Sequence, residues 1–207
     1  PHTTYIHSSH LTDEEWGYVR DSGSNVSFAP QIELQMGHGW APAVTALDYG
    51  VPIGLSTDVC TTAPADLFTQ MRAIFGSERA RRNQIAWDED TDPTKLISCR
   101  QVLEWATLGG AEVAGVADRT GSLTPGKKAD LVILDGQAVN VHPIIDPVAA
   151  VVCAADVSNV KTVLVDGKVL KRDGRLVADL ARPSRLVAES RDYLLTKVKP
   201  QAGWIVG

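Results

Sequence analysis

The chain has 207 residues, a formal net charge of −5 and a pI near 5.5. This acidic balance argues against a nucleic-acid partner, for which a basic patch is expected, and we interpret the only basic cluster, Arg79, Arg81 and Arg82, as a solvated helix face. No apolar run approaches the roughly 18 residues of a membrane span, so no membrane partner is expected either.

Strands and helices alternate in the first part of the chain. A short strand pattern at residues 5–11 precedes a helix that begins after Thr12, which opens a capping box. A buried strand at residues 25–29, a helix that Pro42 opens and a strand at residues 51–55 follow. This order predicts a parallel sheet or a (β/α) barrel.

Helical patterns dominate the middle of the chain. Apolar residues recur at helical spacing from residue 65 to about residue 85, which predicts a long amphipathic helix. An acidic loop at residues 87–93 separates it from a second helical region that begins at Pro93. A further short helix is expected at residues 111–116.

The pattern changes after Gly121. Runs of β-forming residues at 129–134, 160–165 and 168–170 are separated by Gly and Asp turns, and an Asp-Gly hairpin signal joins the last two. A final amphipathic helix is predicted at residues 183–197.

Two side chains stand where barrel enzymes place catalytic groups. Asp58 follows the strand at residues 51–55, and His7 lies at the tip of the strand pattern at residues 5–11. Catalytic residues of (β/α) barrels come from the C-terminal ends of several strands. A His and an Asp at two strand tips therefore predict part of a metal hydrolase site.

Six short motifs occur in a defined order along the chain. They are His7-Ser8-Ser9-His10-Leu11, Gly37-His38-Gly39-Trp40-Ala41-Pro42, Ser56-Thr57-Asp58, the helix start at residues 66–72, the segment at residues 121–131 and Val165-Asp166-Gly167-Lys168-Val169. Each motif is weak by itself. In this order and spacing they resemble the amidohydrolase superfamily, in the branch that holds cytosine and S-adenosylhomocysteine deaminases and the triazine hydrolases.

The resemblance implies an α/β fold, the C-terminal part of a (β/α)8 metal-dependent hydrolase barrel followed by part of a small composite β-domain. Residues 1–120 would hold barrel strands six to eight with their helices, residues 121–182 the β-domain strands, and residues 183–207 a C-terminal helix and tail. The chain starts at Pro1, without Met, at the sixth strand. We therefore expect the C-terminal half of a longer enzyme, whose partner is the N-terminal half or a second copy that covers the open strand edges.

The resemblance also implies one divalent metal, zinc or iron, in the complete enzyme. In the family a His-x-His pair, a further His and the Asp after the eighth strand hold that metal, and no His-x-His occurs in these 207 residues. Asp58 would be both metal ligand and proton acceptor, and His7 would hydrogen-bond the attacking water or the developing charge. We expect no metal and no activity for this chain alone.

Three further residues are expected to bind a small-molecule substrate. His38 lies in the Gly-His-Gly turn after the seventh strand, where loops face the pocket. Where the related deaminases carry Asn-Pro-x-Ser-Asn, this chain reads Ala29-Pro30-Gln31-Ile32-Glu33, which places Gln31 and Glu33 at the pocket wall. His10 either orients His7 or the substrate or is structural. The substrate's polar pattern must then differ from that of the deaminases.

The function predicted is hydrolysis of a carbon–nitrogen bond other than a peptide bond, by a deaminase-like or amidohydrolase-type enzyme acting on a nitrogen heterocycle. One alternative is a non-catalytic scaffold or binding relative that has lost the metal site. Another is an independent α/β domain that only resembles half a barrel.

The cysteines favour a reducing cytoplasm. Cys60, Cys99 and Cys153 are odd in number and widely spaced, and they form neither a Cys-x-x-Cys metal pattern nor a disulfide framework. Cys60, two residues after Asp58, is either a packed loop residue or a reactive thiol.

Overall fold

The computed structural model describes residues 3–198, and its first half contains a parallel sheet. The sheet has three strands in the order β1 (Thr4–Ile6), β2 (Asn25–Phe28) and β3 (Ile53–Leu55). β2 and β3 lie within the strands predicted from the sequence, and β1 overlaps the predicted pattern at residues 5–11 but starts one residue before it. The first is shorter than expected because the backbone turns out of the sheet at His7 and Ser8, where φ is 68° and 56°.

Helices connect the parallel strands, as the α/β prediction requires. Helix α1 (Asp13–Asp21) joins β1 to β2, and α2 (Pro30–Gln35) and α3 (Ala43–Asp48) join β2 to β3. The predicted capping box opens α1: the Glu15 amide donates to Thr12 Oγ1 at 3.3 Å, and the Thr12 amide donates to Glu15 Oε2 at 2.7 Å. Local sequence therefore fixes where the chain turns back after β1.

Helix α2 was not predicted from the sequence. Its six residues are too few to show a helical repeat of apolar residues. The sequence does carry a start signal, because Pro30 occupies the first turn, where the missing N–H leaves no donor unsatisfied. Ile32 and Glu33 are both buried, so α2 packs inward instead of forming an exposed loop.

The long helix α4 (Leu67–Asp88) follows β3 and runs slightly past its predicted end, so that Trp87 belongs to it and not to the acidic loop. Asp66 caps it through a bond from the Thr69 amide at 2.8 Å. The next helix starts at Cys99, later than predicted. Ser98 is its N-cap, because the side chain accepts from the Gln101 amide at 3.3 Å.

The interpretation of the basic cluster as a solvated face is wrong. Arg81 Nε and Arg82 Nε lie 3.0 and 3.6 Å from the carboxylate of Glu78, whose side chain is fully buried. Glu78 also accepts from the Val44 amide at 3.2 Å, and Arg79 donates to a backbone carbonyl at 3.1 Å in the segment before the next helix. A buried carboxylate needs such partners, and Glu78, paired with two of these arginines, joins α4 to α3 through the Val44 amide.

A continuous helix then crosses β3. It consists of α5 (Cys99–Glu104), the π-helical turn η1 (Trp105–Gly109) and α6 (Gly110–Val113). A Cβ on Gly109 would overlap the carbonyl oxygen of Ile53, and a Cβ on Gly54 would lie 2.9 Å from a methyl carbon of Val113. The two glycines therefore let helix and strand backbones meet.

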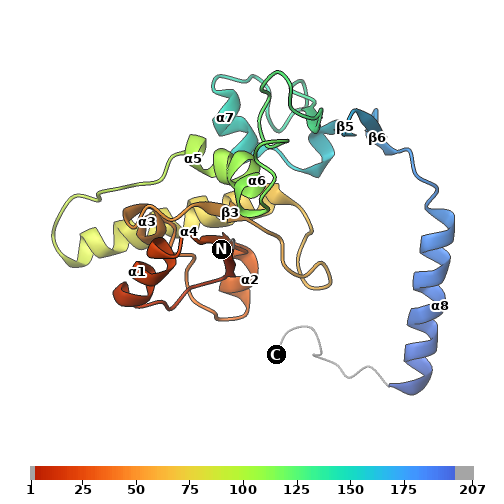
Figure 1. Cartoon of the computed structure of the whole chain (residues 1–207). Helices are drawn as coiled ribbons and strands as arrows, with labels where there is room; N and C mark the ends of the chain where they lie inside the picture. The colour runs from red at the N-terminus through yellow and green to blue at the C-terminus, as the bar shows by residue number, and fades with distance from the viewer. Residues whose placement is uncertain (1–2, 199–207) are drawn as a thin grey trace.

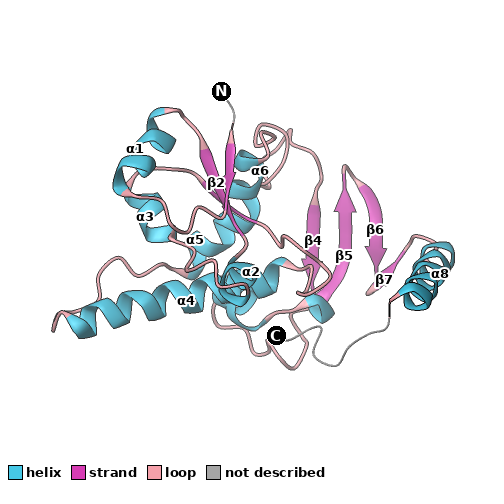
Figure 2. Cartoon of the chain, turned by 90° about the horizontal axis from the view of Figure 1, so that it is seen from below, coloured by secondary structure: helices cyan, strands magenta, loops and turns pink. Residues whose placement is uncertain are grey.

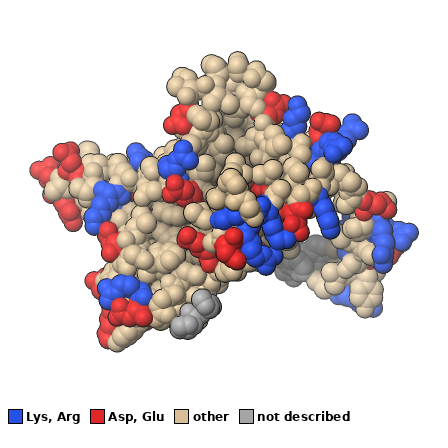
Figure 3. All heavy atoms as spheres, turned by 45° about the horizontal axis from the view of Figure 1, so that its top comes forward, with Lys and Arg blue, Asp and Glu red and all other residues tan. Residues whose placement is uncertain are grey.

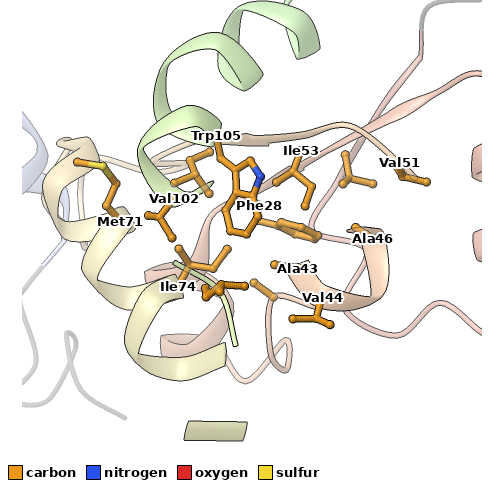
Figure 4. Close-up of a cluster of buried hydrophobic side chains, with 14 of the residues drawn as sticks. Phe28, Ala43, Val44, Ala46, Val51, Ile53, Met71, Ile74, Val102 and Trp105 are labelled. Carbon is orange, nitrogen blue, oxygen red and sulfur yellow. The ribbon is translucent and has the colours of Figure 1, made fainter. Parts of the chain in front are cut away.

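The hydrophobic core lies between the parallel sheet and the helices that cover it. Figure 4 shows Phe28 and Ile53 from the sheet meeting Ile74 of α4 and Val102 and Trp105 of the crossing helix. Burying a side chain of this size contributes about 1.5–3 kcal/mol relative to leaving it in water. The core thus joins the sheet to helices that are far away in the sequence.

The second half contains an antiparallel sheet, seen beside the first in Figure 2. Its order is β4 (Leu131–Leu134), β5 (Val160–Val165), β6 (Lys168–Arg172) and β7 (Arg175–Leu176). The first three match the predicted runs. The Asp-Gly turn between β5 and β6 has positive φ at both residues, as a tight hairpin requires. A second Asp-Gly turn, with the same positive φ angles, leads into β7, which was not predicted.

Helical turns interrupt the range in which only β-strands were expected. They are α7 (Pro147–Ala149), η2 (Ala150–Ala154) and η3 (Val157–Asn159). Val152 of η2 is completely buried and belongs to the core of the first half. Packing therefore ties this segment to α4 and α5, although the chain places it between β4 and β5.

The last described element, α8 (Ala181–Lys197), extends away from the other elements in Figure 1. It was predicted, and none of its residues is buried. No helix within residues 3–198 is both long enough and apolar enough to cross a membrane. On the face shown in Figure 3, acidic and basic side chains lie among one another.

We predict that Gly109→Ala destabilises the protein by about 1–3 kcal/mol, the usual cost of overpacking, because the added methyl group meets the Ile53 carbonyl. The matched control is Gly76→Ala in α4, where a Cβ has nothing within 4 Å; it should be neutral or slightly stabilising. Urea denaturation of both variants measures the difference. Equal midpoints would show that the crossing helix can move away from β3.

Candidate active site

The candidate site lies where the three parallel strands end. His7 follows β1 directly, Glu33 lies on α2 after β2, and Asp58 lies three residues beyond the end of β3. The C-terminal ends of parallel strands meet at one edge of the sheet, so side chains from separate parts of the chain converge there. Sequence reasoning had named all three residues, and they lie together.

The imidazole of His7 lies between two carboxylates. Its Nδ1 is 3.1 Å from Glu33 Oε1, and its Nε2 is 3.9 Å from Asp58 Oδ2. The side chains of His7 and Asp58 keep 29% and 34% of their exposure, whereas that of Glu33 is completely buried. Because a carboxylate only accepts, the Glu33 contact favours a proton on Nδ1, which leaves Nε2 facing the open side beside Asp58.

The backbone at these positions is unusual. His7, Ser8 and Asp58 all have φ between 53° and 68°, the left-handed region that non-glycine residues rarely adopt. The His7 amide still donates to the Ser27 carbonyl at 3.0 Å, so the turn begins while β1 is bonded to β2. Such conformations cluster at functional sites, where the surrounding structure holds them.

Glu33 differs from its predicted role as a residue of the pocket wall. Its carboxylate is enclosed, and its Oε1 accepts from the Ala29 amide at 2.9 Å as well as from His7. Desolvation raises the pKa of the Glu33 carboxyl, while the Ala29 amide and the His7 ring lower it. A residue so placed positions His7 and has no surface to offer a substrate.

His38 is among the residues that line the cavity beside His7. Its ring meets that of His7 edge-on, with centroids 5.4 Å apart, and its amide donates to the Glu33 carbonyl at 2.8 Å. Gln31 does not join this group: its amide donates to Gln70 of α4 at 3.1 Å, so its backbone is bonded on the α4 side. Neither Gln31 nor Glu33 lines the cavity next to His7.

A cavity of about 460 Å³ opens beside His7. Its lining residues are His7, Ser9, His10, Leu11, Glu15, Gly37 and His38. His10 packs over Gly39, where a Cβ would lie 3.1 Å from its ring, so this glycine makes room for the imidazole. Sequence reasoning gave Ser9 and Glu15 no part in the pocket; Ser9 lies in the loop after β1, where the strand-tip position was the available signal, and Glu15 lies in the first turn of α1, where nothing in the sequence indicated a pocket.

Within residues 3–198, no group of three or more His, Cys, Asp or Glu side chains could hold a metal ion. Asp58 and His7 lie close enough to contact the same ion, but a catalytic zinc site uses three protein ligands. The described residues therefore do not make up a metal site on their own.

Comparison with known proteins gives a consistent result. Residues 2–170 match the model of the Amidohydrolase family. The chain is 32% identical over 171 residues to a 5-methylthioadenosine/S-adenosylhomocysteine deaminase of Acetivibrio thermocellus, covering 82% of this chain and 38% of that protein. It is 34% identical over 178 residues to a 5′-deoxyadenosine deaminase of Methanosarcina mazei, covering 86% and 39%.

Solved structures agree in fold. An adenosine deaminase from Xanthomonas campestris with bound zinc superposes with a TM-score of 0.83 at 29% identity, covering 93% of this chain and 42% of that one. An atrazine chlorohydrolase from Arthrobacter aurescens complexed with zinc gives 0.75 at 27%, covering 91% and 40%. The chain thus spans about two fifths of the length of the proteins it matches.

We predict that the 207-residue chain, after dialysis against zinc or iron and then buffer, retains no stoichiometric metal, because its described residues supply fewer than three ligands. Elemental mass spectrometry measures the content, with Asp58→Asn as the comparison. Retained metal at one ion per chain that disappears in Asp58→Asn would contradict the prediction.

We also predict that Glu33→Gln changes how stability depends on pH. Because the folded pKa of Glu33 is raised above its ordinary value of 4.5, the folded state holds a proton that the unfolded chain has released, and stability falls as pH rises from that value. Glu33→Gln lacks this loss, so above that pH its free energy of unfolding should rise relative to that of the wild type. Urea denaturation at several pH values measures the difference.

The control is Glu15→Gln, for which the expected change of stability with pH has the opposite sign. The bonds from Thr12 lower the pKa of Glu15, so this carboxylate adds stability that is present above its ordinary pKa and lost as pH falls through the lowered value. Parallel pH profiles for wild type and Glu33→Gln would contradict the burial of an ionisable Glu33.

Proposed function

Because the chain belongs to the amidohydrolase family, we propose that it forms the C-terminal part of a metal-dependent hydrolase that cleaves a carbon–nitrogen bond of a small nitrogen heterocycle, in a deaminase-type reaction. Water replaces an amino group on the ring, and ammonia leaves. The rest of the barrel, from the N-terminal half or a second copy of the chain, would complete the pocket.

One observation carries this proposal: His7 lies between the buried carboxylate of Glu33 and the partly exposed carboxylate of Asp58 at the C-terminal edge of the parallel strands. A scaffold without catalytic function would have no reason to keep His7 and Asp58 facing each other, each with its backbone in the left-handed conformation. The similarity to deaminases supports the same reaction class.

In the complete enzyme, Asp58 would be one ligand of a divalent cation, zinc or iron, with its remaining ligands outside this chain. Such a cation supplies Lewis acidity and lowers the pKa of water. The second role of Asp58 is to take up a proton at a carboxylate oxygen and pass it to the leaving nitrogen. Its partial exposure leaves that oxygen accessible to a substrate.

His7 would act through Nε2. With the proton on Nδ1 held by Glu33, Nε2 accepts a hydrogen bond from the attacking water, and in its protonated form donates to the charge that develops on the ring. The enclosed Glu33 carboxylate stabilises that imidazolium, because opposite charges interact more strongly away from water. Glu33 is therefore a positioning residue.

The relatives and the pocket wall support this substrate class. Two of the similar proteins are deaminases of adenine nucleosides or their thioethers, and another solved neighbour is a triazine hydrolase. In this chain the pocket beside His7 presents the imidazoles of His10 and His38 and the carboxylate of Glu15. Such groups suit a small molecule with ring nitrogens and hydroxyl groups.

Because neither Gln31 nor Glu33 lines the cavity, the expectation of a polar pattern different from that of the deaminases loses its basis, and we predict that the completed enzyme releases ammonia from adenine nucleosides such as 5′-deoxyadenosine. In that enzyme Asp58→Asn should remove nearly all activity, because ligand and proton acceptor are lost together. His7→Asn should lower kcat by about 10²–10⁴, the usual range for one general acid–base group, while the metal stays bound. Ammonia release and elemental mass spectrometry measure both effects.

The matched control is His10→Asn, which changes another imidazole that lines the same cavity and should alter KM more than kcat. Metal loss in His7→Asn equal to that in Asp58→Asn would contradict the role given to His7. Full activity in both Asp58→Asn and His7→Asn would show that another site carries the reaction.

A further inference from the structure

Two of the three cysteines meet in space, although the sequence pattern suggested no pair. Cys99 is the first residue of α5, and Cys153 lies in η2, 54 residues later. Their Sγ atoms are 3.7 Å apart, which is sulfur–sulfur contact, and both are free thiols. Cys60, the third, lies in the loop after Asp58 and is exposed.

The two thiols differ in their surroundings. Cys153 is exposed, whereas Cys99 is half-buried and packs against the core. Burial, followed by the contact with Cys153, raises the pKa of Cys99 to about 11, so its thiol stays protonated at neutral pH. We therefore expect an oxidant to react first with Cys153, whose sulfur is in contact with that of Cys99.

The elements that carry the thiols are both held by the core. Val102 of α5 and Val152 of η2, one residue from Cys153, are each completely buried. Asp146 caps the helical turns before η2 through a bond from the Val148 amide at 2.8 Å. Folding thus brings the two sulfur atoms together and keeps them there, and a bond near 2.05 Å requires the sulfurs to approach further from 3.7 Å.

We propose that Cys99 and Cys153 form a reversible disulfide when the protein meets a peroxide. The Cys153 thiol releases its proton, the thiolate attacks one peroxide oxygen and the O–O bond breaks; a sulfenic acid forms, and the leaving hydroxide takes up that proton and becomes water. The Cys99 sulfur then attacks the sulfenic sulfur, an S–S bond forms and a second water leaves. Two thiols are oxidised and one peroxide is reduced, so atoms and electrons balance.

The bond would join the crossing helix to the segment that leads into β5. Closing a loop of 54 residues removes much chain entropy from the unfolded state, so the oxidised protein should be more stable. The same helix carries Gly109, which meets β3. Oxidation would therefore stiffen the support behind the strand that precedes Asp58 without touching the candidate site.

The test treats the 207-residue protein with a small molar excess of hydrogen peroxide. We expect loss of the mass of two hydrogen atoms, a peptide that links Cys99 to Cys153, one remaining free thiol at Cys60, and a Tm higher by several degrees. Dithiothreitol should reverse each change. Cys153→Ser should abolish the linked peptide and the Tm shift, while Cys60→Ser should keep both.

Three outcomes would overturn the proposal. One is a stable sulfenic or sulfinic acid on Cys153 with Cys99 still free, which would show that the two sulfurs do not reach each other. Another is oxidation only at Cys60, as disulfide-linked dimers that vanish in Cys60→Ser. The third is a linked peptide that dithiothreitol does not cleave, because the proposed bond is reversible; a linked peptide with an unchanged or lowered Tm would contradict only the expected stabilisation.

Discussion

The backbone contact between β3 and the crossing helix is the constraint on which the first half of the molecule depends. Gly109 rests on the Ile53 carbonyl and Gly54 on the side chain of Val113, so neither element can move closer or turn without a clash. A π-helical turn in the helix lets it pass this point while it continues to pack. The strand that leads to Asp58 is thereby held on both sides, by β2 and by the helix.

Two buried carboxylates show how similar groups take different roles. Glu78 has two arginines and a backbone amide as partners, and it serves to hold helices together. Glu33 has only the Ala29 amide and His7, and among the described residues its Oε2 has no hydrogen-bond partner. An incompletely compensated charge beside a histidine is characteristic of a site of chemistry more than of a structural anchor.

The alternation of strands and helices was predictable because caps, prolines and glycines mark the element ends locally. The convergence of His7 and Asp58 was also predictable, because both follow strands of a parallel sheet and such strands end at one edge. The burial of Glu33 and the pairing of Cys99 with Cys153 were not, because both depend on contacts between distant segments. Helix α2 and the turns around η2 were too short to show a period.

The left-handed backbone at His7, Ser8 and Asp58 also limits which residues these positions can accept. Glycine adopts this conformation most readily, asparagine, aspartate and histidine are the other residues found in it most often, and β-branched residues are strongly disfavoured. A sequence that keeps these turns is therefore restricted mainly to these four residues, whatever reaction it catalyses, and Ser8 is the unusual residue among the three. Variation at Ser8 would thus report the shape of the turn, while variation at His7 and Asp58 would report shape and chemistry together.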